Sequence, residues 1–457
     1  MSNIKRQTSC LLLVALLLVA CAQPRPTPTP VPPTSTPALA TAIPTSTSPR
    51  PTSTPGARRE VRIGVVYPLS GRLERWGQEA WPFIQMAEAD INASPEAIAA
   101  GLRFRYIVRS SETTEERAQA AVRDLVENEG LRVIVGLPLS GELAATIPYL
   151  TQHHLAVISS ASTSPQPELR QPDAVFRIAP PELYLARTFA RFALNLGYRK
   201  AAVIYRTDEW GPSYVAEIAA TFEAQGYPTV LVPIEPTHPQ VGDYAAEVAQ
   251  LSARVAGLGA DEEMVVFMVV WEGEDLNILH HAAQDPTLSS VRWLSALLYP
   301  SMLSGQFSEL SFPEVRDFAL AHSLWGQEFH SPTNDLVRRL WAQAKAKLGY
   351  EPRFEHVYLY DAMQIAAHAV LAAGTADDGL AVAAAIPTAV EGYDPAMGSI
   401  RFDENGDRAS GDLAYYGLFQ GQRGFEYRYF AFYDAATDRF VVLPEPEPRQ
   451  IEFCPEC

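Results

Sequence analysis

One segment of the chain carries the hydrophobic pattern of a complete strand–helix–strand unit. Val133–Val135 and Leu155–Ile158 are short apolar runs, as expected of strands that are buried on both faces of a parallel sheet. Between them, Leu143, Ile147 and Leu150 recur at helical spacing. Such a crossover is right-handed, so the two strands point the same way and the loops that follow them emerge at the same edge of the sheet.

The same alternation of apolar runs and amphipathic stretches continues on both sides of this unit. Strands are predicted at 61–66, 104–108 and 264–270. Helices are predicted where apolar residues share one helical face, as at Ala80, Ile84, Ala87 and Ile91 and at Tyr214, Ile218 and Phe222. Strands that alternate with helices predict an α/β fold with parallel sheets.

The pattern restarts near Lys200 and repeats the construction of the preceding part. After the N-terminal region the chain has about 400 residues, which is too many for one small core and suits two lobes. We therefore expect a second α/β lobe to begin near Pro180, with a first crossing between the lobes at 177–181.

Hydroxyl side chains follow both strands of the first unit described. Ser140 precedes the predicted helix, and a loop containing Ser162 and Thr163 follows the second strand. The first N–H groups of a helix lack intrahelical partners and carry partial positive charge, so a carboxylate fits beside them. Ser is also a favoured helix cap, and Ser and Thr are common in loops, so the residues themselves leave both interpretations open.

The N-terminus has the features of an export signal. Residues 1–20 contain basic residues and then an apolar run that is shorter than the roughly 20 residues of a membrane span. The four residues ending at Cys21, LVAC, resemble the bacterial lipobox, which implies cleavage before Cys21 and lipid attachment to its thiol. We expect an extracytoplasmic protein that is lipid-anchored to the outer face of the membrane, or periplasmic. The alternative is a secretory signal in which this cysteine is incidental.

Residues 21–58 are rich in Pro, Thr and Ser and contribute many of the 37 prolines of the chain. Such a segment lacks the apolar side chains of a core and favours extended conformations. We expect a semi-rigid linker between the lipid and the folded lobes.

Charge and cysteine content exclude several function classes. The net charge of −17 argues against nucleic-acid binding, which depends on Lys and Arg. Cys454 and Cys457 are only half of a structural zinc set, and Cys457 is the last residue, so no helix can follow to lower a thiol pKa. We interpret them as a terminal disulfide or as incidental thiols, and we expect neither a metal nor a cofactor.

An ordered set of motifs indicates a family. The segments RIGVVYPLSG, the two hydroxyl loops, FRIAPP and VIYRTDEWG occur in the order found in periplasmic binding proteins of the leucine/isoleucine/valine-binding type, which the chain resembles from Glu60 to about Asp438. The resemblance implies the type I fold, with two doubly wound parallel-sheet lobes joined by a three-segment hinge. The implied lobes are 59–179 plus 325–409 and 180–324 plus 410–447, followed by a tail at 448–457.

The resemblance also assigns ligand-binding roles. Ser140 and Thr163 are similar to residues that grip a ligand carboxylate, and Ser162 to one that offers its carbonyl to an amine. Trp76 corresponds to an aromatic residue on the first loop of the first lobe. Trp210 and Trp271 correspond to aromatic residues of the second lobe that close over the ligand.

The chain departs from the family pattern at the expected partner of a ligand ammonium group. Amino-acid-binding relatives carry an acid just after the strand at 292–295, where this chain has Ala-Leu-Leu-Tyr. Because an isolated buried ammonium is costly, either another acid pairs with it or the ligand lacks one. The candidate replacements for this acid are Glu272, Asp208 and Glu209. Together with the three tryptophans, Tyr299 could also enclose a flat or cationic ligand by stacking.

These features predict a solute-binding lipoprotein that captures an amino acid or another carboxylate and delivers it to an ABC permease. A ligand-sensing module for a signalling partner is the alternative that the sequence leaves open. An extracellular hydrolase is less consistent, because the chain has no GxSxG or HExxH motif. Its His153-His154 and His280-His281 pairs are adjacent rather than four residues apart on one helix face.

Overall fold

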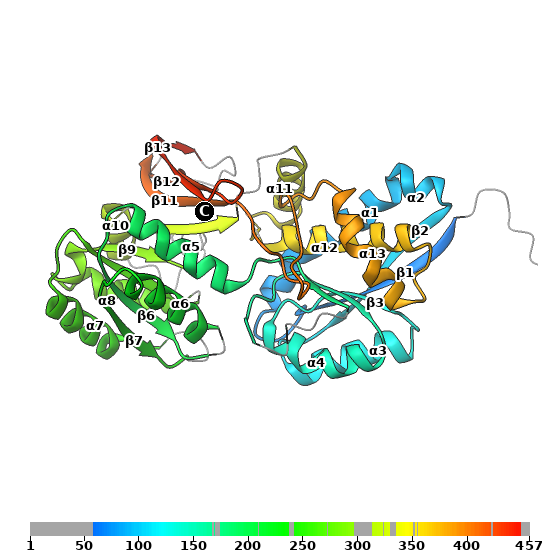
Figure 1. The fold of residues 1–457 in the computed structure, drawn as a ribbon, viewed down its shortest axis with the longest axis horizontal. Helices are drawn as coiled ribbons and strands as arrows, with labels where there is room; N and C mark the ends of the chain where they lie inside the picture. Colours follow the sequence, from blue (N-terminus) through cyan, green and yellow to red (C-terminus); the bar gives the residue numbers. More distant parts are fainter. Residues whose placement is uncertain are drawn as a thin grey trace, which may run out of the picture. The chain divides into compact units, whose positions relative to one another are not determined.

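The computed structural model contains two β-sheets, each covered by helices on both faces (Figure 1). It describes residues 58–448 except 167–168, 170–173, 209, 237–241, 272, 297–312, 323, 330–334, 351, 354 and 422–423. The predicted α/β class with two parallel-sheet lobes is confirmed. None of the helices in these ranges is long and apolar enough to span a bilayer.

The first sheet has five parallel strands in the order β2-β1-β3-β4-β5. They are β1 (Arg59–Tyr67), β2 (Leu102–Ser110), β3 (Val133–Gly136), β4 (Ala156–Ser159) and β5 (Val175–Arg177). All residues of β3 and β4 are buried, as the continuous apolar runs predict. The two strands pair in parallel, with Val133 opposite Ala156, so the predicted strand–helix–strand unit is present.

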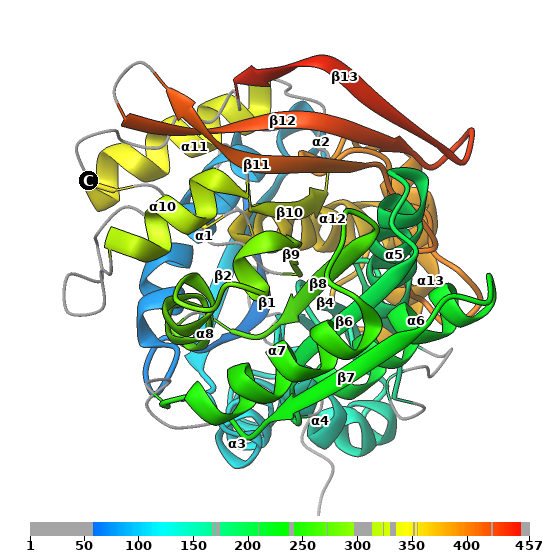
Figure 2. The same cartoon turned by 90° about the vertical axis from the view of Figure 1, so that its left-hand side faces the viewer.

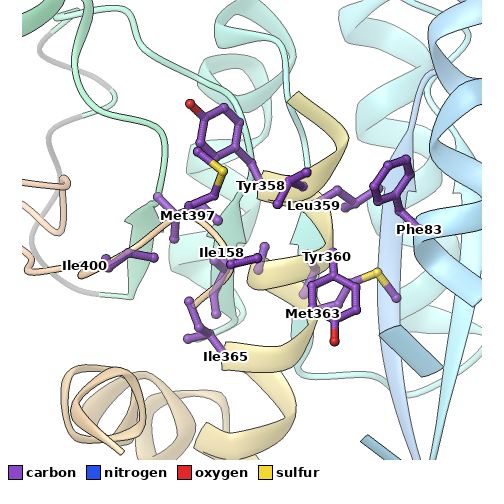
Figure 3. Packing of buried hydrophobic residues seen from close by; sticks show 14 of the residues in the cluster. Phe83, Ile158, Tyr358, Leu359, Tyr360, Met363, Ile365, Met397 and Ile400 are labelled. Carbon is purple, nitrogen blue, oxygen red and sulfur yellow. The ribbon is translucent and has the colours of Figure 1, made fainter. Parts of the chain in front are cut away.

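Helices cover both faces of this sheet. They are α1 (Glu74–Ala93), α2 (Pro95–Ala99), α3 (Glu115–Glu127), α4 (Ser140–Gln152), α11 (Asp335–Leu348), α12 (Glu355–Ala373) and α13 (Gly379–Glu391). Because side chains alternate along a strand, Ile63 and Val65 pack with α1 and α12, whereas Val66 packs with α3 and α4. Figure 3 shows Leu359 of α12 pointing toward Phe83 of α1. The nearly uniform burial of α12 therefore reflects its position between α1 and the sheet.

The second sheet has eight strands in the order β13-β12-β11-β10-β9-β8-β6-β7. They are β6 (Lys200–Arg206), β7 (Thr229–Ile234), β8 (Met264–Val269), β9 (Arg292–Ser295), β10 (Trp325–Phe329), β11 (Leu413–Gly421), β12 (Gly424–Asp434) and β13 (Arg439–Pro448). The strands β6 to β10 are parallel to one another, but β11, β12 and β13 run antiparallel as a meander at one edge (Figure 2). This antiparallel extension was not predicted, and β13 ends one residue beyond the expected end of the lobe.

Both faces of the second sheet are also covered. The helices are α5 (Glu182–Asn195), α6 (Gly211–Glu223), α7 (Ala245–Leu258), α8 (Glu274–Ala283) and α10 (Pro313–Ala321), with a 3-10 turn at Leu288–Ser290. Val203 and Phe267 pack with α5 and α6, whereas Ile204 and Met268 pack with α7 and α8. Tyr214, Ile218 and Phe222 are all buried, as the helical spacing predicts.

The assignment of 325–329 to the first lobe was wrong. β10 pairs in parallel with β9 and antiparallel with β11, so it belongs to the second sheet. The helix α10 lies between β9 and β10 in the sequence, so it belongs to the connection between these two parallel strands. The chain therefore passes to the first lobe between Phe329 and Asp335, after one more strand than expected.

The other two crossings are tied together by buried ions. β5 ends at Arg177, and α5 begins against α6 at Glu182. The guanidinium of Arg177 binds both carboxylate oxygens of Asp407, at 2.5 and 2.6 Å, and Asp407 forms a parallel bridge with Arg177 just before the return to β11. Arg408 donates to the carbonyls of Met397 and Ser399. These bonds fix the outgoing and the returning segment side by side.

Trp76 was expected in the loop before the first helix, but it lies inside α1. Pro82 is also inside this helix, beyond its first turn, where a missing N–H is usually unfavourable. The helix α1 can begin at Glu74 because Gly77 packs directly against the backbone at Pro68. The Cβ of any other residue at position 77 would lie 2.1 Å from the carbonyl oxygen of Pro68. The close approach brings the start of α1 directly onto the end of β1.

Candidate functional site

The two predicted hydroxyl loops meet at the carboxyl edge of the first sheet. Ser140 Oγ lies 3.1 Å from Ser162 Oγ and accepts the backbone N–H groups of Thr163 and Ser164, at 3.3 and 3.2 Å. Ser140 is the first residue of α4, and the preceding cap position, Leu139, makes no side-chain cap bond. The Ser140 hydroxyl therefore ties the loop after β4 to the helix. Its role toward a ligand stays a prediction.

A buried acid lies next to this loop at the first crossing. Glu182 begins α5, and its carboxylate accepts hydrogen bonds from Thr163 Oγ1, at 3.2 Å, and from the Ser213 hydroxyl on α6. Burial raises the pKa of Glu182 to about 7, although the bonds from Ser213 and Thr163 favour the ionised form. This carboxyl group joins a loop of the first lobe to a helix of the second.

Trp76 is buried beside a polar network beneath the end of β1. Its ring lies 5.3 Å from the ring of Tyr67 and 6.0 Å from that of His356. The two nitrogens of His356 contact Tyr67 Oη and Glu79 Oε2, both at 3.4 Å. Burial acts to raise the pKa of Glu79, but the His356 hydrogen bond and the charge of Arg353 outweigh it and lower the pKa. Trp76 is thus held by core packing, with little surface left for a ligand.

At the carboxyl edge of the second sheet, Arg206 organises two acids and an aromatic ring. Arg206 ends β6 and is buried; it binds Glu274 and, at 2.8 Å, Asp208. The other oxygen of Glu274 accepts the backbone N–H of Trp271 at 3.0 Å. The guanidinium carbon lies 4.1 Å from the centre of the Trp271 ring. Burial raises the pKa of Glu274, and the charge of Arg206 opposes that shift.

Trp210 lies next to this cluster at the start of α6. Asp208 Oδ1 accepts the N–H groups of Trp210 and Gly211, at 3.2 and 3.1 Å, which satisfies two donors at the helix start. The Trp210 ring lies 5.4 Å from that of Tyr214. Asp208 is therefore committed to the helix and to Arg206, which leaves it poorly suited to hold a ligand ammonium.

Arg72 links the two lobes at Trp271. It lies in the segment between β1 and α1 of the first lobe, and its guanidinium carbon is 5.0 Å from the centre of the Trp271 ring. Loss of hydration and the nearby charge of Arg206 lower the pKa of Arg72, while Asp208 and Glu274 act in the opposite direction. Two guanidinium groups from different lobes thus lie against one indole ring.

The remaining sequence-based candidates lie outside the described residues: Glu209, Glu272, Tyr299, Cys21, Cys454 and Cys457. In the described ranges, no group of three or more His, Cys, Asp or Glu side chains is arranged to hold a metal ion. Sequence reasoning missed Arg72, Glu182, Arg206 and Glu274. The only local signal for the last three was their position at the ends of predicted strands or the starts of helices.

Comparisons with known proteins agree with this architecture. Residues 60–422 match the family model described as periplasmic binding protein. An uncharacterised protein of Methanocaldococcus jannaschii is 24% identical over 324 residues, which is 69% of this chain and 74% of that protein. Among solved structures, a leucine-binding protein from Thermotoga maritima superposes with a TM-score of 0.66 at 19% identity, covering 82% of this chain and 99% of that one. A solute-binding protein from Rhodopseudomonas palustris in complex with 3,4-dihydroxybenzoic acid gives 0.65 at 19% identity, with 83% and 98% covered.

Proposed function

This chain belongs to the periplasmic binding protein family, and from that premise we propose that it captures a small carboxylate-bearing molecule between its two lobes and delivers it to an ABC permease. The family consists of extracytoplasmic solute-binding proteins rather than enzymes, so the hydrolase alternative is rejected. Among the structural neighbours, one is named as a leucine-binding protein and another holds 3,4-dihydroxybenzoic acid. A carboxylate is the group that these two ligands share.

The convergence of Ser140 with the Ser162–Thr163 loop carries this proposal. The hydroxyls and the first N–H groups of α4 lie at the carboxyl edge of a parallel sheet, where open α/β folds bind ligands. Ligand contacts that involve both lobes stabilise the closed arrangement, so binding shifts the population toward it. Thr163 of the first lobe and Ser213 of the second donate to the same Glu182 carboxylate, which supports a coupling between the lobes.

We expect the double variant Ser140→Ala/Thr163→Ala to bind its carboxylate ligand about 10- to 100-fold more weakly, since each hydrogen bond contributes about 0.5–1.5 kcal/mol. Isothermal titration calorimetry with leucine and 3,4-dihydroxybenzoate measures the change. Ser290→Ala/Thr437→Ala removes two hydroxyls away from this edge and serves as the matched control. Unchanged affinity in the first variant would remove this pair from the site.

We further propose that Cys21 carries a lipid and that residues 21–58 act as the spacer. Cells fed a labelled fatty acid are expected to label the full chain, and Cys21→Ala is expected to abolish the label, because the thiol is the attachment point. Cys457→Ala removes a different thiol and should retain the label. Equal labelling of the Cys21→Ala protein would refute the anchor.

A further inference from the structure

Arg72 is a cation at the position where the two lobes meet, and none of the described acids forms an ion pair with it. Its side chain is exposed, and within the described part of the chain it forms neither a hydrogen bond nor an ion pair. Its guanidinium carbon lies 5.0 Å from the centre of the Trp271 ring of the other lobe. A guanidinium group has five N–H donors in a planar fork that matches a carboxylate. None of the described residues accepts a hydrogen bond from them.

The acids near Arg72 are already engaged. Glu274 is shared between the guanidinium of Arg206 and the backbone N–H of Trp271. Asp208 is shared between Arg206 and the N-terminus of α6. The oxygens of both carboxylates are therefore occupied by protein donors, and the two acids share the charge of Arg206. A ligand ammonium group at this position would displace one of these bonds and would face two guanidinium groups.

Glu182, the acid beside Thr163, does not offer an ammonium site either. It is fully buried, and both of its oxygens accept hydroxyl hydrogen bonds. Burial and weak charge compensation hold its pKa near neutrality, so it is a poor counter-ion at pH 7. Glu274, Asp208 and Glu182 are thus each hydrogen-bonded to protein groups, so none of these three is a ready partner for a ligand ammonium group.

We propose that Arg72, held against Trp271, selects ligands with a net negative charge and no ammonium group, so that the protein prefers a simple or hydroxy-substituted carboxylate over a zwitterionic amino acid. This inference rests on the proposed function and specifies its ligand class. An incoming carboxylate would supply acceptors for the N–H groups of Arg72 and would offset the repulsion from Arg206. Because Arg206 also lies against the Trp271 ring, the ring is fixed before the ligand arrives.

A matched ligand pair tests this selectivity. Leucine and 2-hydroxy-4-methylpentanoate share a carbon skeleton and a carboxylate, but leucine carries an ammonium group where the hydroxy acid carries a hydroxyl group. In a second pair, 3,4-dihydroxybenzoate carries a negative charge and its amide is neutral. Calorimetric titration of the full chain is expected to show at least tenfold tighter binding of the hydroxy acid than of leucine, and of the benzoate than of the amide. Arg72→Gln keeps hydrogen-bond donors but removes the charge, and should reduce both preferences to below about threefold.

Arg105→Gln removes an exposed charge from β2 and is expected to match the wild type. If the wild type prefers leucine and Arg72→Gln does not change that preference, this inference is overturned, while solute binding itself, and with it the proposed function, stands. An unchanged benzoate-over-amide preference in Arg72→Gln would overturn it as well. If none of the four ligands binds, both the inference and the proposed function are contradicted.

Discussion

Replacing Arg177 with methionine is expected to lower the free energy of unfolding by about 3–5 kcal/mol, the range for removing one partner of a buried ion pair. Only 1% of the Arg177 side chain and 4% of the Asp407 side chain are exposed. The change leaves the Asp407 carboxylate buried without its two N–H donors. Urea unfolding followed by tryptophan fluorescence measures the loss.

The same variant should also weaken ligand binding. Arg177 Nη1 donates to the carbonyl of Ser164 at 2.6 Å, in the loop whose N–H groups contact Ser140. Loss of that bond frees the loop that carries Thr163. We expect Arg177→Met to reduce the affinity for the ligand more than Arg117→Met, which removes the same charge from the surface.

Two controls separate the buried charge from the loss of a side chain. Arg177→Met/Asp407→Leu removes both ions and should recover most of the stability, since an apolar pair of similar volume often replaces a buried ion pair without cost. Arg117→Met removes half of an exposed pair, with side chains 56% and 44% exposed, and should cost less than about 1 kcal/mol. If Arg177→Met and the double variant were equally unstable, the uncompensated charge would not be the cause.

The hydrophobic pattern was sufficient to predict the layers of both lobes. Strands such as β3 and β8 are buried on both faces, so their apolar runs are unambiguous. The meeting of Ser140 with Ser162 followed from the handedness of one crossover, which is a general property of parallel sheets. These conclusions needed only local periodicity and topology.

The charged groups of the site could not be predicted in the same way. Arg206 and Glu274 are 68 residues apart in the sequence and meet only because β6 and β8 are neighbours in the sheet. Glu182 follows two prolines and reads as an ordinary acid of a first helical turn, where negative charge is common whether buried or not. Arg72 belongs to a polar turn, and its contact with Trp271 depends on the other lobe.

The boundary error at β10 has a related cause. The short sequence Trp325–Phe329 has no pattern that assigns it to either sheet, since a five-residue strand looks alike in both lobes. Its pairing with β9 and β11 decides the matter. In a chain that crosses three times between similar lobes, local sequence identifies strands but does not assign each one to a lobe.

Replacing Glu142 with glutamine is expected to stabilise the protein at pH 8 by up to about 3 kcal/mol, at about 1.4 kcal/mol per pKa unit, and to change little near pH 4.5. Burial raises the pKa of Glu142 from 4.5 to about 7, and the charge of Glu115 adds to this, while the Ser111 hydroxyl opposes it. The side chain is only 2% exposed, and neither oxygen has a well-formed hydrogen bond within the described chain. Urea unfolding at several pH values measures the difference.

The sign of the pH dependence follows from which state binds the proton. Between pH 4.5 and about 7 the folded protein keeps the Glu142 proton and the unfolded chain releases it, so the contribution of this group to stability falls as pH rises through that window. Glutamine stays neutral and removes this loss, whereas Glu60→Gln, at an exposed position, should leave the wild-type pH profile unchanged. If the free energies of unfolding of Glu142→Gln and the wild type differed by a constant amount from pH 4.5 to 8, the Glu142 carboxyl group would not ionise within this pH range. Because Glu142 lies in the first turn of α4, two residues after Ser140, its ionisation above about pH 7 places a buried charge at the helix start that the ligand is proposed to use.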